Sequence, residues 1–284
     1  MLNPQIDVYM GCDCPFEQAE TVLFGAPFDS TTSNRPGTRF GPFALRRESY
    51  GLELYSPYQD KDLSDCAVLD SGDLELSMGS SELALADIEE RAEEILSAGK
   101  RPFLIGGEHL VTLGAFRAVH RKYPDVAIIH FDAHTDLRED YLGVPLSHAC
   151  VIRRCWELTG DGKIFQFGIR SGDREEWRWG KDHVSTHRFD GLENVVERLG
   201  DAPVYFTVDL DVMDPSVFPG TGTPEPGGVS FDALRRAVTL VCSRCNVVGC
   251  DVNELCPPFD QSGVSNAVAA KVVREMLLAL SSVN

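Results

Sequence analysis

The sequence lacks long hydrophobic runs and has little positive charge. No stretch approaches the roughly 18 consecutive apolar residues that a membrane-spanning helix needs. Its first residues, Met1-Leu2-Asn3-Pro4, include neither the basic start nor the apolar run of a secretory signal, so we expect a cytoplasmic protein. Only 26 basic residues stand against 44 acidic ones, for a net charge of -18. We therefore expect no nucleic-acid or membrane partner, and an acidity that attracts a cationic small molecule or simply keeps the surface soluble.

Regularly spaced cysteines are also absent. The nine cysteines are an odd number without a repeated interval, which is typical of a reducing compartment rather than of a disulfide framework. Cys242 and Cys245 have the spacing of half a zinc site, but they lie in a predicted helix and far along the chain from Cys12 and Cys14. We therefore expect no structural zinc.

Seven short apolar segments recur along the chain, each nearly continuous, as in strands that are buried on both faces. They are residues 21–25, 66–70, 102–105, 126–131, 164–168, 204–208 and 247–252. Helical spacing is found between several of them, at residues 81–98, 110–122, 231–243 and 262–280. The alternation predicts an α/β fold with one parallel sheet and helices on both of its faces. No repeat or linker interrupts residues 1–284, so we expect a single domain.

Ligand-type side chains follow the strand predicted at residues 126–131. Asp132, His134 and Asp136 alternate with Ala133 and Thr135. If the extended geometry continues, the three ligand-type side chains project toward one side. Taken alone, this segment would favour turn and capping chemistry over a metal site.

Two further strands end in residues of the same kind. Asp209 and Asp211 follow the strand at 204–208, and His109 follows the strand at 102–105. Because ligands of parallel sheets bind at the carboxyl ends of the strands, we expect all six side chains to meet at one edge. Four carboxylates gathered without a cation would repel one another, so the arrangement indicates a metal site.

Six ligands are too many for one tetrahedral ion and suit two ions that share carboxylates. Carboxylate and imidazole ligands without sulfur favour Mn²⁺, with Co²⁺, Ni²⁺, Fe²⁺ or Zn²⁺ as substitutes. Two such ions close together lower the pKa of a shared water and present hydroxide at neutral pH.

Two more residues fit the same edge of the sheet. Glu254 follows the strand at 247–252, and its carboxylate could bind a guanidinium through paired hydrogen bonds. His148 lies on a loop beyond the metal segment and could pass a proton to a leaving amine. Taken alone, Glu254 or His148 would more often be a structural residue. The remaining histidines match no ligand pattern and receive no role: His120, His130, His183 and His187.

Several segments, spread over about half of the chain, resemble the ureohydrolases, the family that includes arginase and agmatinase. The matching segments are Gly106-Gly107-Glu108-His109, Asp132-Ala133-His134-Thr135-Asp136, Ser147-His148, residues 208–215, Pro219-Gly220-Thr221-Gly222-Thr223-Pro224 and Asp251-Val252-Asn253-Glu254. Residues 35–42 extend the similarity toward the N-terminus.

The resemblance implies a single ureohydrolase domain with a three-layer α/β/α fold around a parallel sheet of about eight strands. It also implies a homo-oligomer, either a trimer or a hexamer, and two Mn²⁺ per chain. One ion would be held by His109, Asp132, Asp136 and Asp209. The other would be held by Asp132, His134, Asp209 and Asp211, so that Asp132 and Asp209 bridge the two ions.

The same resemblance implies a role for each catalytic residue. A hydroxide that bridges the ions, oriented by Asp136, would attack the guanidinium carbon of the substrate. Glu254 would hold the substrate, and His148 would bind near the departing amine and serve it with a proton.

Within the family, the sequence is more similar to bacterial agmatinases than to arginases. Arg138 stands where arginases carry the asparagine that binds the substrate's α-carboxylate, and residues 137–141 resemble the agmatinase segment. Residues 147–154 and 168–172 favour the same subgroup. The implied reaction converts agmatine to putrescine and urea, in polyamine biosynthesis, and a doubly positive substrate suits an acidic pocket.

Two departures from the family pattern keep other guanidino substrates open. Glu108 stands where many members have aspartate, although it is not an expected ligand. Ala149-Cys150-Val151 is more apolar than the family's usual segment beside the substrate, which leaves guanidinobutyrate and arginine as alternatives.

The sequence disfavours three other classes of protein. A non-catalytic metal-binding protein on this fold would be indicated by a lost ligand, and all six are present. A related single-zinc deacetylase would not need both His109 and the paired carboxylates. A nucleotide-binding domain is disfavoured because Glu108 follows Gly106-Gly107 where a glycine-rich phosphate cradle would continue.

Overall fold

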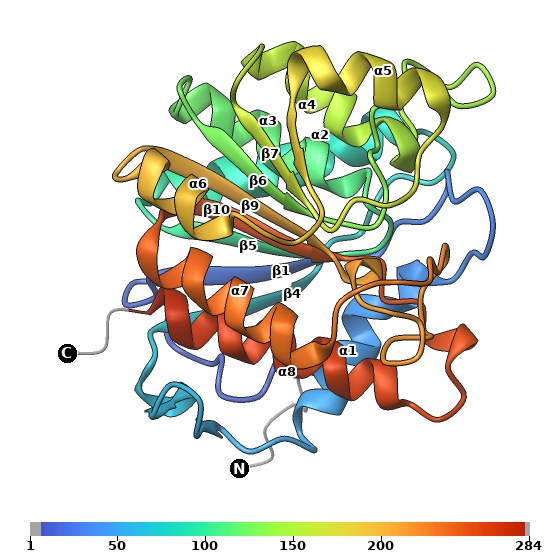
Figure 1. Ribbon diagram of the computed structural model, residues 1–284. Coiled ribbons are helices and arrows are strands. Elements are labelled where there is room, and N and C mark those ends of the chain that lie inside the picture. The colour runs from blue at the N-terminus through green and yellow to red at the C-terminus, as the bar shows by residue number, and fades with distance from the viewer. Residues whose placement is uncertain (1–6, 282–284) are drawn as a thin grey trace.

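An eight-stranded parallel sheet lies at the centre of the computed structural model, which describes residues 7–281 (Figure 1). The strand order is β4-β1-β5-β10-β9-β6-β7-β8. The strands are β1 (Thr21–Ala26), β4 (Val68–Asp73), β5 (Arg101–Gly106), β6 (Ala127–Phe131), β7 (Ile164–Phe167), β8 (Ser185–His187), β9 (Pro203–Asp209) and β10 (Asn246–Asn253). The α/β fold with one parallel sheet of eight strands is therefore confirmed.

Helices cover both faces of this sheet (Figure 1). One face carries α2 (Ser81–Ser97), α3 (Val111–Lys122), α4 (Val151–Thr159) and α5 (Arg174–His183). The other carries α1 (Gly41–Ser49), α6 (Leu192–Leu199), α7 (Phe231–Arg244) and α8 (Val264–Leu280). Short 3-10 turns and a small antiparallel ribbon complete the elements: η1 (Thr38–Phe40), η2 (Leu63–Asp65), η3 (His148–Cys150), η4 (Leu210–Val212), η5 (Pro257–Phe259), β2 (Tyr55–Ser56) and β3 (Lys61–Asp62).

The continuous apolar character of the strands follows from two separate hydrophobic cores. Along β5, Phe103 and Ile105 pack into the core beneath α7 and α8, whereas Leu104 packs into the core beneath α2 and α3. Side chains alternate between the faces of a strand, so a strand covered by helices on both faces needs apolar residues at consecutive positions.

The predicted elements are nearly all present, and the shortest ones were missed. All seven predicted strands and all four predicted helices appear, with ends displaced by a few residues. The unpredicted eighth strand, β8, has three residues at the edge of the sheet, and all three are half-buried. The unpredicted helices α1, α4, α5 and α6 have eight to ten residues, too few turns for a clear helical period.

The strand order decides where the site lies. Strands β5, β10, β9 and β6 are consecutive neighbours at the centre of the sheet and run parallel. Their carboxyl ends therefore lie side by side, and Asp209 on β9 pairs directly with Asn253 on β10. Four segments that are distant in sequence thus open onto one surface. No helix among residues 7–281 is both long and apolar enough to cross a membrane.

Candidate metal centre

The structure brings all six predicted metal ligands together at the ends of three central strands. His109 follows β5, Asp132 begins the segment after β6, and Asp209 is the last residue of β9. Five of the six side chains are buried, and His134 is half-buried.

The first group of ligands surrounds the imidazole of His109. Its Nδ1 atom lies 3.0 Å from Asp132 Oδ2, 3.1 Å from Asp136 Oδ2 and 3.5 Å from Asp209 Oδ2. One imidazole nitrogen therefore faces three carboxylate oxygens. This is the ligand set that the family resemblance implies for one of the two ions.

The second group lies on the other side of Asp132. His134 Nδ1 is 2.9 Å from Asp211 Oδ2 and 3.4 Å from Asp132 Oδ1. The two oxygens of Asp132 are thus divided between the groups, with Oδ2 facing His109 and Oδ1 facing His134. A carboxylate that presents one oxygen to each of two ligand groups has the geometry of a bridge.

The local backbone that produces this convergence differs from the prediction. β6 ends at Phe131, and Asp136 has a left-handed conformation with φ of 51° rather than an extended one. Asp211 lies in the 3-10 turn η4, where its backbone N–H donates to Asp209 Oδ1 over 2.8 Å. The expected continuous extension through Asp136 is therefore wrong. His134 still pairs with Ser171 in an isolated parallel bridge, but the backbone departs from the extended conformation at Asp136 and enters a 3-10 turn after Asp209.

Hydrogen bonding beneath His109 shows that a cation fits between these groups. The Thr207 hydroxyl donates to Asp251 Oδ1 over 2.5 Å, so its oxygen accepts from His109 Nε2–H over 2.9 Å. The Nδ1 atom then carries the lone pair, and it is buried without a hydrogen-bond partner within residues 7–281. A lone pair that faces three carboxylates is repelled by all of them, so this position requires a positive charge. Burial opposes a proton there, but Asp132 and Asp136 outweigh it and raise the pKa of His109 well above its usual range. A divalent cation among the carboxylates would take the place of that proton.

The pKa values of two carboxyl groups also indicate mutual repulsion among the ligands. Burial and the neighbouring Asp132 raise the pKa of Asp136 to about 7. Burial, with Asp211 and Asp132 close by, raises the pKa of Asp209 well above its usual range. A divalent cation would reverse both shifts, because it stabilises the charged form of each carboxyl group.

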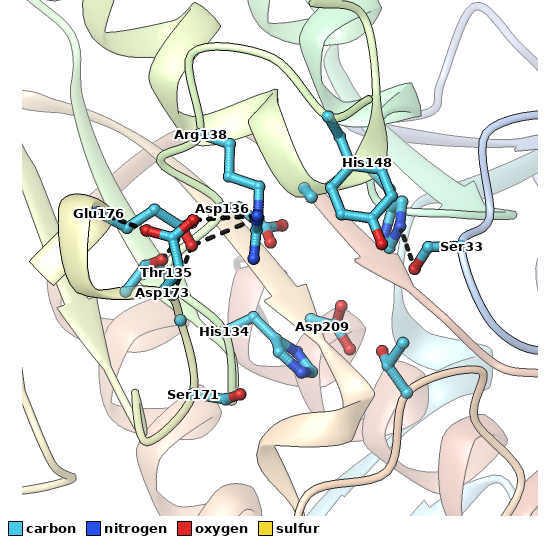
Figure 2. Close-up of a pocket in the computed structure, with 14 residues that line it drawn as sticks. Ser33, His134, Thr135, Asp136, Arg138, His148, Ser171, Asp173, Glu176 and Asp209 are labelled. Atoms are coloured by element: carbon cyan, nitrogen blue, oxygen red, sulfur yellow. Dashed lines mark hydrogen bonds and ion pairs between the residues drawn. The ribbon is translucent and has the colours of Figure 1, made fainter. Parts of the chain in front are cut away.

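A cavity of about 360 Å³ opens directly above the candidate centre (Figure 2). Its walls include His134, Asp136 and Asp209 from the ligand groups. Arg138 also lines it, and this guanidinium is paired with Asp173 at 3.0 Å and with Glu176 at 3.4 Å. The lining therefore contains four carboxylates and one arginine, and two of these carboxylates already neutralise the arginine.

His148 lies in this cavity, where the sequence predicted it. Its Nε2 atom is 3.0 Å from Ser33 Oγ (Figure 2). Its backbone N–H donates to Thr31 Oγ1 over 3.0 Å. Burial, together with nearby His134 and His109, lowers the pKa of His148 to about 4. The imidazole is therefore neutral at pH 7.

Glu254 lies beneath the cavity rather than in its lining. The residue follows β10 in a left-handed conformation with φ of 68°, and its Oε1 atom accepts the backbone N–H of His109 over 2.8 Å. Its Oε2 atom lies 3.6 Å from the point that a Cβ on Gly222 would occupy. The carboxylate therefore supports a metal ligand with one oxygen and approaches the 219–224 segment with the other.

Glu108 connects the metal segment to the loop that holds His148. Its buried carboxylate accepts the backbone N–H and hydroxyl of Thr31 and the hydroxyl of Thr32. As expected, it is not among the ligand groups. The position that departs from the family pattern thus orders the Thr31 side of the cavity.

Of the second departure from the family pattern, Ala149-Cys150-Val151, only one residue contacts the cavity. Ala149 lines the cavity, whereas Cys150 and Val151 are completely buried beneath it. Only the methyl group of Ala149 is therefore presented to a ligand.

Sequence reasoning missed part of this cavity. Ser33, Asp173, Glu176 and Thr223 all line it, and Thr223 donates to Asp211 Oδ2 over 3.2 Å. Ser33 and Thr223 lie on loops, Asp173 caps α5 and Glu176 lies in its first turn, and none of them stands in a ligand pattern. Only Thr223, inside the 219–224 segment, belonged to a motif that had been singled out.

Comparisons with known proteins agree with this geometry. The model of the arginase family matches residues 19–279. The chain is 48% identical to an agmatinase of Bacillus anthracis, over 93% of this chain and 92% of the relative. It is 46% identical to an agmatinase of Bacillus subtilis, over 95% of each chain. The crystal structure of agmatine ureohydrolase of Thermoplasma volcanium superposes with a TM-score of 0.88 at 33% identity, covering 97% of this chain and 94% of the other.

Proposed function

The chain belongs to the arginase family and is an amidinohydrolase, and from this premise we propose that it hydrolyses agmatine to putrescine and urea at a pair of divalent metal ions. The agmatinase relatives, which align along nearly the whole chain, support agmatine as the substrate. The oxygen and nitrogen ligands support Mn²⁺ as the metal, because hard and intermediate ligands without sulfur suit that ion.

The observation that carries the proposal is the division of Asp132 between two ligand groups. Its Oδ2 faces His109, whose Nδ1 also contacts Asp136 and Asp209. Its Oδ1 faces His134, whose Nδ1 also contacts Asp211. This arrangement provides enough ligands for two ions and too many for one. When bound, two such ions activate water as a nucleophile at neutral pH.

The charges of the cavity favour an amine at the far end of the substrate. Asp136 and Asp209 lie toward the metal centre, and Asp173 and Glu176 lie on the wall beside Arg138 (Figure 2). The guanidinium of agmatine would bind near the first pair and its ammonium near the second. A carboxylate tail, as in guanidinobutyrate, would find only Arg138, whose guanidinium is already engaged by two carboxylates.

We assign proton handling to His148 and substrate binding to His148 and Glu254. His148 lines the cavity and is held by Ser33, which places an imidazole where it would exchange a proton with the departing amine. Glu254 provides a carboxylate for the guanidinium. Asp136, which both lines the cavity and contacts His109, would orient the attacking water.

A urea-release assay tests this proposal. Mn²⁺-loaded protein is compared with agmatine, arginine and guanidinobutyrate as substrates, and agmatine should give the highest kcat/KM. Asp209→Asn should lose at least two orders of magnitude in rate, because one of the carboxylates that would hold the metal ions is neutralised. Asp125→Asn is the matched control, since the Asp125 side chain is 95% exposed. Urea release from none of the three substrates would overturn the proposal, and a preference for guanidinobutyrate or arginine would replace agmatine.

A further inference from the structure

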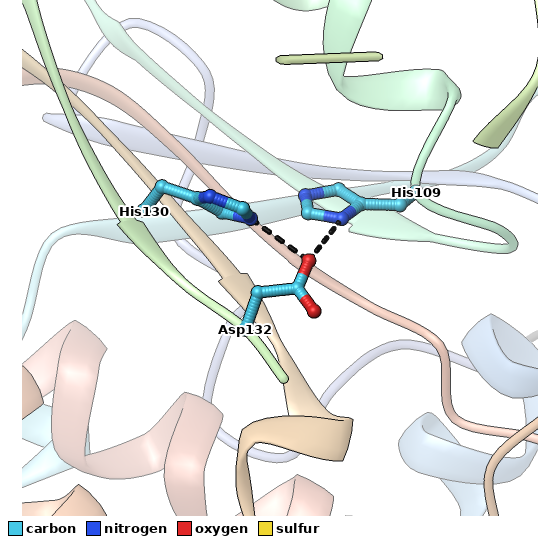
Figure 3. A group of neighbouring side chains, drawn as sticks. All are labelled: His109, His130 and Asp132. Atoms are coloured by element: carbon cyan, nitrogen blue, oxygen red, sulfur yellow. Dashed lines mark hydrogen bonds and ion pairs between the residues drawn. The ribbon is translucent and has the colours of Figure 1, made fainter. Parts of the chain in front are cut away.

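His130 belongs to neither ligand group, yet it contacts the carboxylate that both groups share. Its Nε2 atom is 2.8 Å from Asp132 Oδ2, the oxygen that also faces His109 (Figure 3). His130 and Asp132 are both completely buried. The two imidazoles point at one oxygen from different directions, with ring centroids 5.1 Å apart and planes inclined by 46°.

The hydrogen bonds behind His130 determine which nitrogen carries its proton. Gln166 on β7 places its Nε2 amide 2.7 Å from the carbonyl oxygen of Thr135 and 3.1 Å from His130 Nδ1. A carbonyl oxygen only accepts, so the atom facing it is the NH₂ group of Gln166. That same NH₂ group donates to His130 Nδ1, which is therefore the acceptor nitrogen.

Thr186 on β8 secures this orientation of the amide. Its hydroxyl donates to Gln166 Oε1 over 3.1 Å, so both ends of the amide are specified. With Nδ1 accepting, the proton of the neutral ring lies on Nε2, and His130 donates to Asp132. The direction of the chain is Thr186 to Gln166 to His130 to Asp132, across three neighbouring strands of the sheet.

Asp132 then receives one hydrogen bond on each of its oxygens. His134 donates its backbone N–H to Oδ1 over 2.6 Å, and His130 donates to Oδ2. Two donors on opposite oxygens oppose rotation of the carboxylate about its Cβ–Cγ bond. The division of the two oxygens between the ligand groups depends on that rotation being blocked.

We propose that His130 is a positioning residue: its Nε2–H, oriented by Gln166, holds the Asp132 carboxylate in the bridging orientation that divides it between the two ligand groups. The inference rests on the proposed two-metal centre and names a residue that keeps it assembled. His130 is not itself a ligand, because its proton occupies the nitrogen that faces the site.

Two substitutions separate hydrogen-bond donation from simple filling of space. His130→Phe fills the buried volume without a donor, and His130→Gln places an amide N–H close to the position of the imidazole Nε2–H. The readouts are the affinity for Mn²⁺, measured by calorimetric titration of metal-free protein, and the Tm of the metal-free protein. His120→Phe is the matched control, because this half-buried histidine on α3 packs against Phe116 away from the site.

His130→Phe should weaken Mn²⁺ binding by roughly 10- to 100-fold, as removal of a residue that orients a ligand typically does. His130→Gln should restore most of that affinity, and His120→Phe should leave it unchanged. Wild-type affinity in His130→Phe would overturn the inference. Equal losses in the Phe and Gln variants would overturn it too, since they would indicate a direct ligand. An affinity loss that only follows a lower Tm of the metal-free protein would reduce His130 to a structural residue.

Gln166→Met provides an independent test should His130→Phe fail to fold. This substitution removes the hydrogen bond that fixes the proton of His130 on Nε2 and leaves the contact between His130 and Asp132 in place. We therefore expect a smaller loss of Mn²⁺ affinity than in His130→Phe. An unchanged affinity would contradict the role of Gln166 in orienting His130. Wild-type protein that binds two Mn²⁺ and releases urea from agmatine sustains the proposed function whatever these variants show. Wild-type protein that does neither overturns both proposals.

Discussion

At the scale of single residues, the candidate centre contains two strained backbone positions. Asp136 and Glu254 both have positive φ, at 51° and 68°, a region that non-glycine residues rarely adopt. Each follows a central strand and turns its carboxylate back toward the same site. Such strain persists where the surrounding structure enforces it and is characteristic of functional positions.

Outside the ligand groups, Glu108 makes the clearest contribution to the pH dependence of the free energy of unfolding. Burial raises its pKa to about 7, against an ordinary value of 4.5, although hydrogen bonds from Thr31 and Thr32 oppose the shift. The folded protein therefore holds this proton more tightly than the unfolded chain does. The resulting stabilisation is present below about pH 4.5 and is lost as the pH rises through 7, a change of roughly 3 kcal/mol.

Glu108→Gln should remove this part of the pH dependence. The free energy of unfolding, measured by urea denaturation between pH 4.5 and 8, should fall less steeply with pH in the variant, even if lost contacts to Thr31 lower its absolute stability. Glu197→Gln, at an exposed position, should keep the wild-type slope. An unchanged slope in Glu108→Gln would show that the carboxyl group ionises normally.

At the scale of elements, the site depends on how closely the strand ends approach one another. Gly107, between β5 and His109, donates its N–H to Ala26 O over 2.9 Å and accepts from Glu254 N over 3.0 Å. It thereby joins the ends of β1, β5 and β10. A Cβ at this position would lie 1.9 Å from the backbone oxygen of Phe28, so only glycine allows the three segments to meet.

Gly107→Ala should therefore disrupt the fold and the metal centre together. The expected loss is about 3 kcal/mol or more in the free energy of unfolding, because the clash is with backbone and cannot be relieved by a rotamer change. Chemical denaturation and Mn²⁺ titration would measure both effects. Gly51→Ala is the control, since the nearest atom there is 3.3 Å away and no positive φ is required. Near-wild-type values for Gly107→Ala would contradict this close approach.

At the scale of the whole molecule, a cluster of four buried carboxylates lies at the middle of the sheet. It opposes folding unless it is neutralised, because the carboxylates lose their hydration and repel one another. Bound cations would convert this cost into a stabilising contribution, and occupancy of the centre would then be coupled to the stability of the entire domain.

Removing metal should accordingly lower the Tm of the whole protein. At a free-ion concentration of about one hundred times Kd, each bound ion contributes about 2.7 kcal/mol, so two ions raise the Tm by roughly 9 °C for a chain of this size. Thermal unfolding before and after chelation, followed by return of Mn²⁺, would measure the change. The Tm should recover on return of the ion. A Tm that changes neither on chelation nor on return of Mn²⁺ would show that the carboxylates are accommodated without a cation.

The chemistry of the centre could be predicted from the sequence because it depends on residue type and on the ends of strands. A continuous apolar run marks a buried strand, and Asp132 and Asp209 stand directly after two such runs. Parallel strands present their carboxyl ends at one edge, so both residues had to lie there. Their local conformations, including the left-handed Asp136, depend on tertiary contacts and were predicted wrongly.

The fold class, the six candidate ligands and the family can thus be predicted from the order of the amino acids, since each is recorded in short local patterns. The folded chain was needed to establish how Asp132 is divided between two ligand groups, why His130 faces it, and which loop residues, such as Ser33 and Asp173, complete the cavity. These features arise between segments that become neighbours through the order of the strands. The hydrogen bonds that link β8 to β7 and β7 to β6 produce no regular residue pattern in the sequence. Their donors and acceptors come within about 3 Å of each other only when the chain folds.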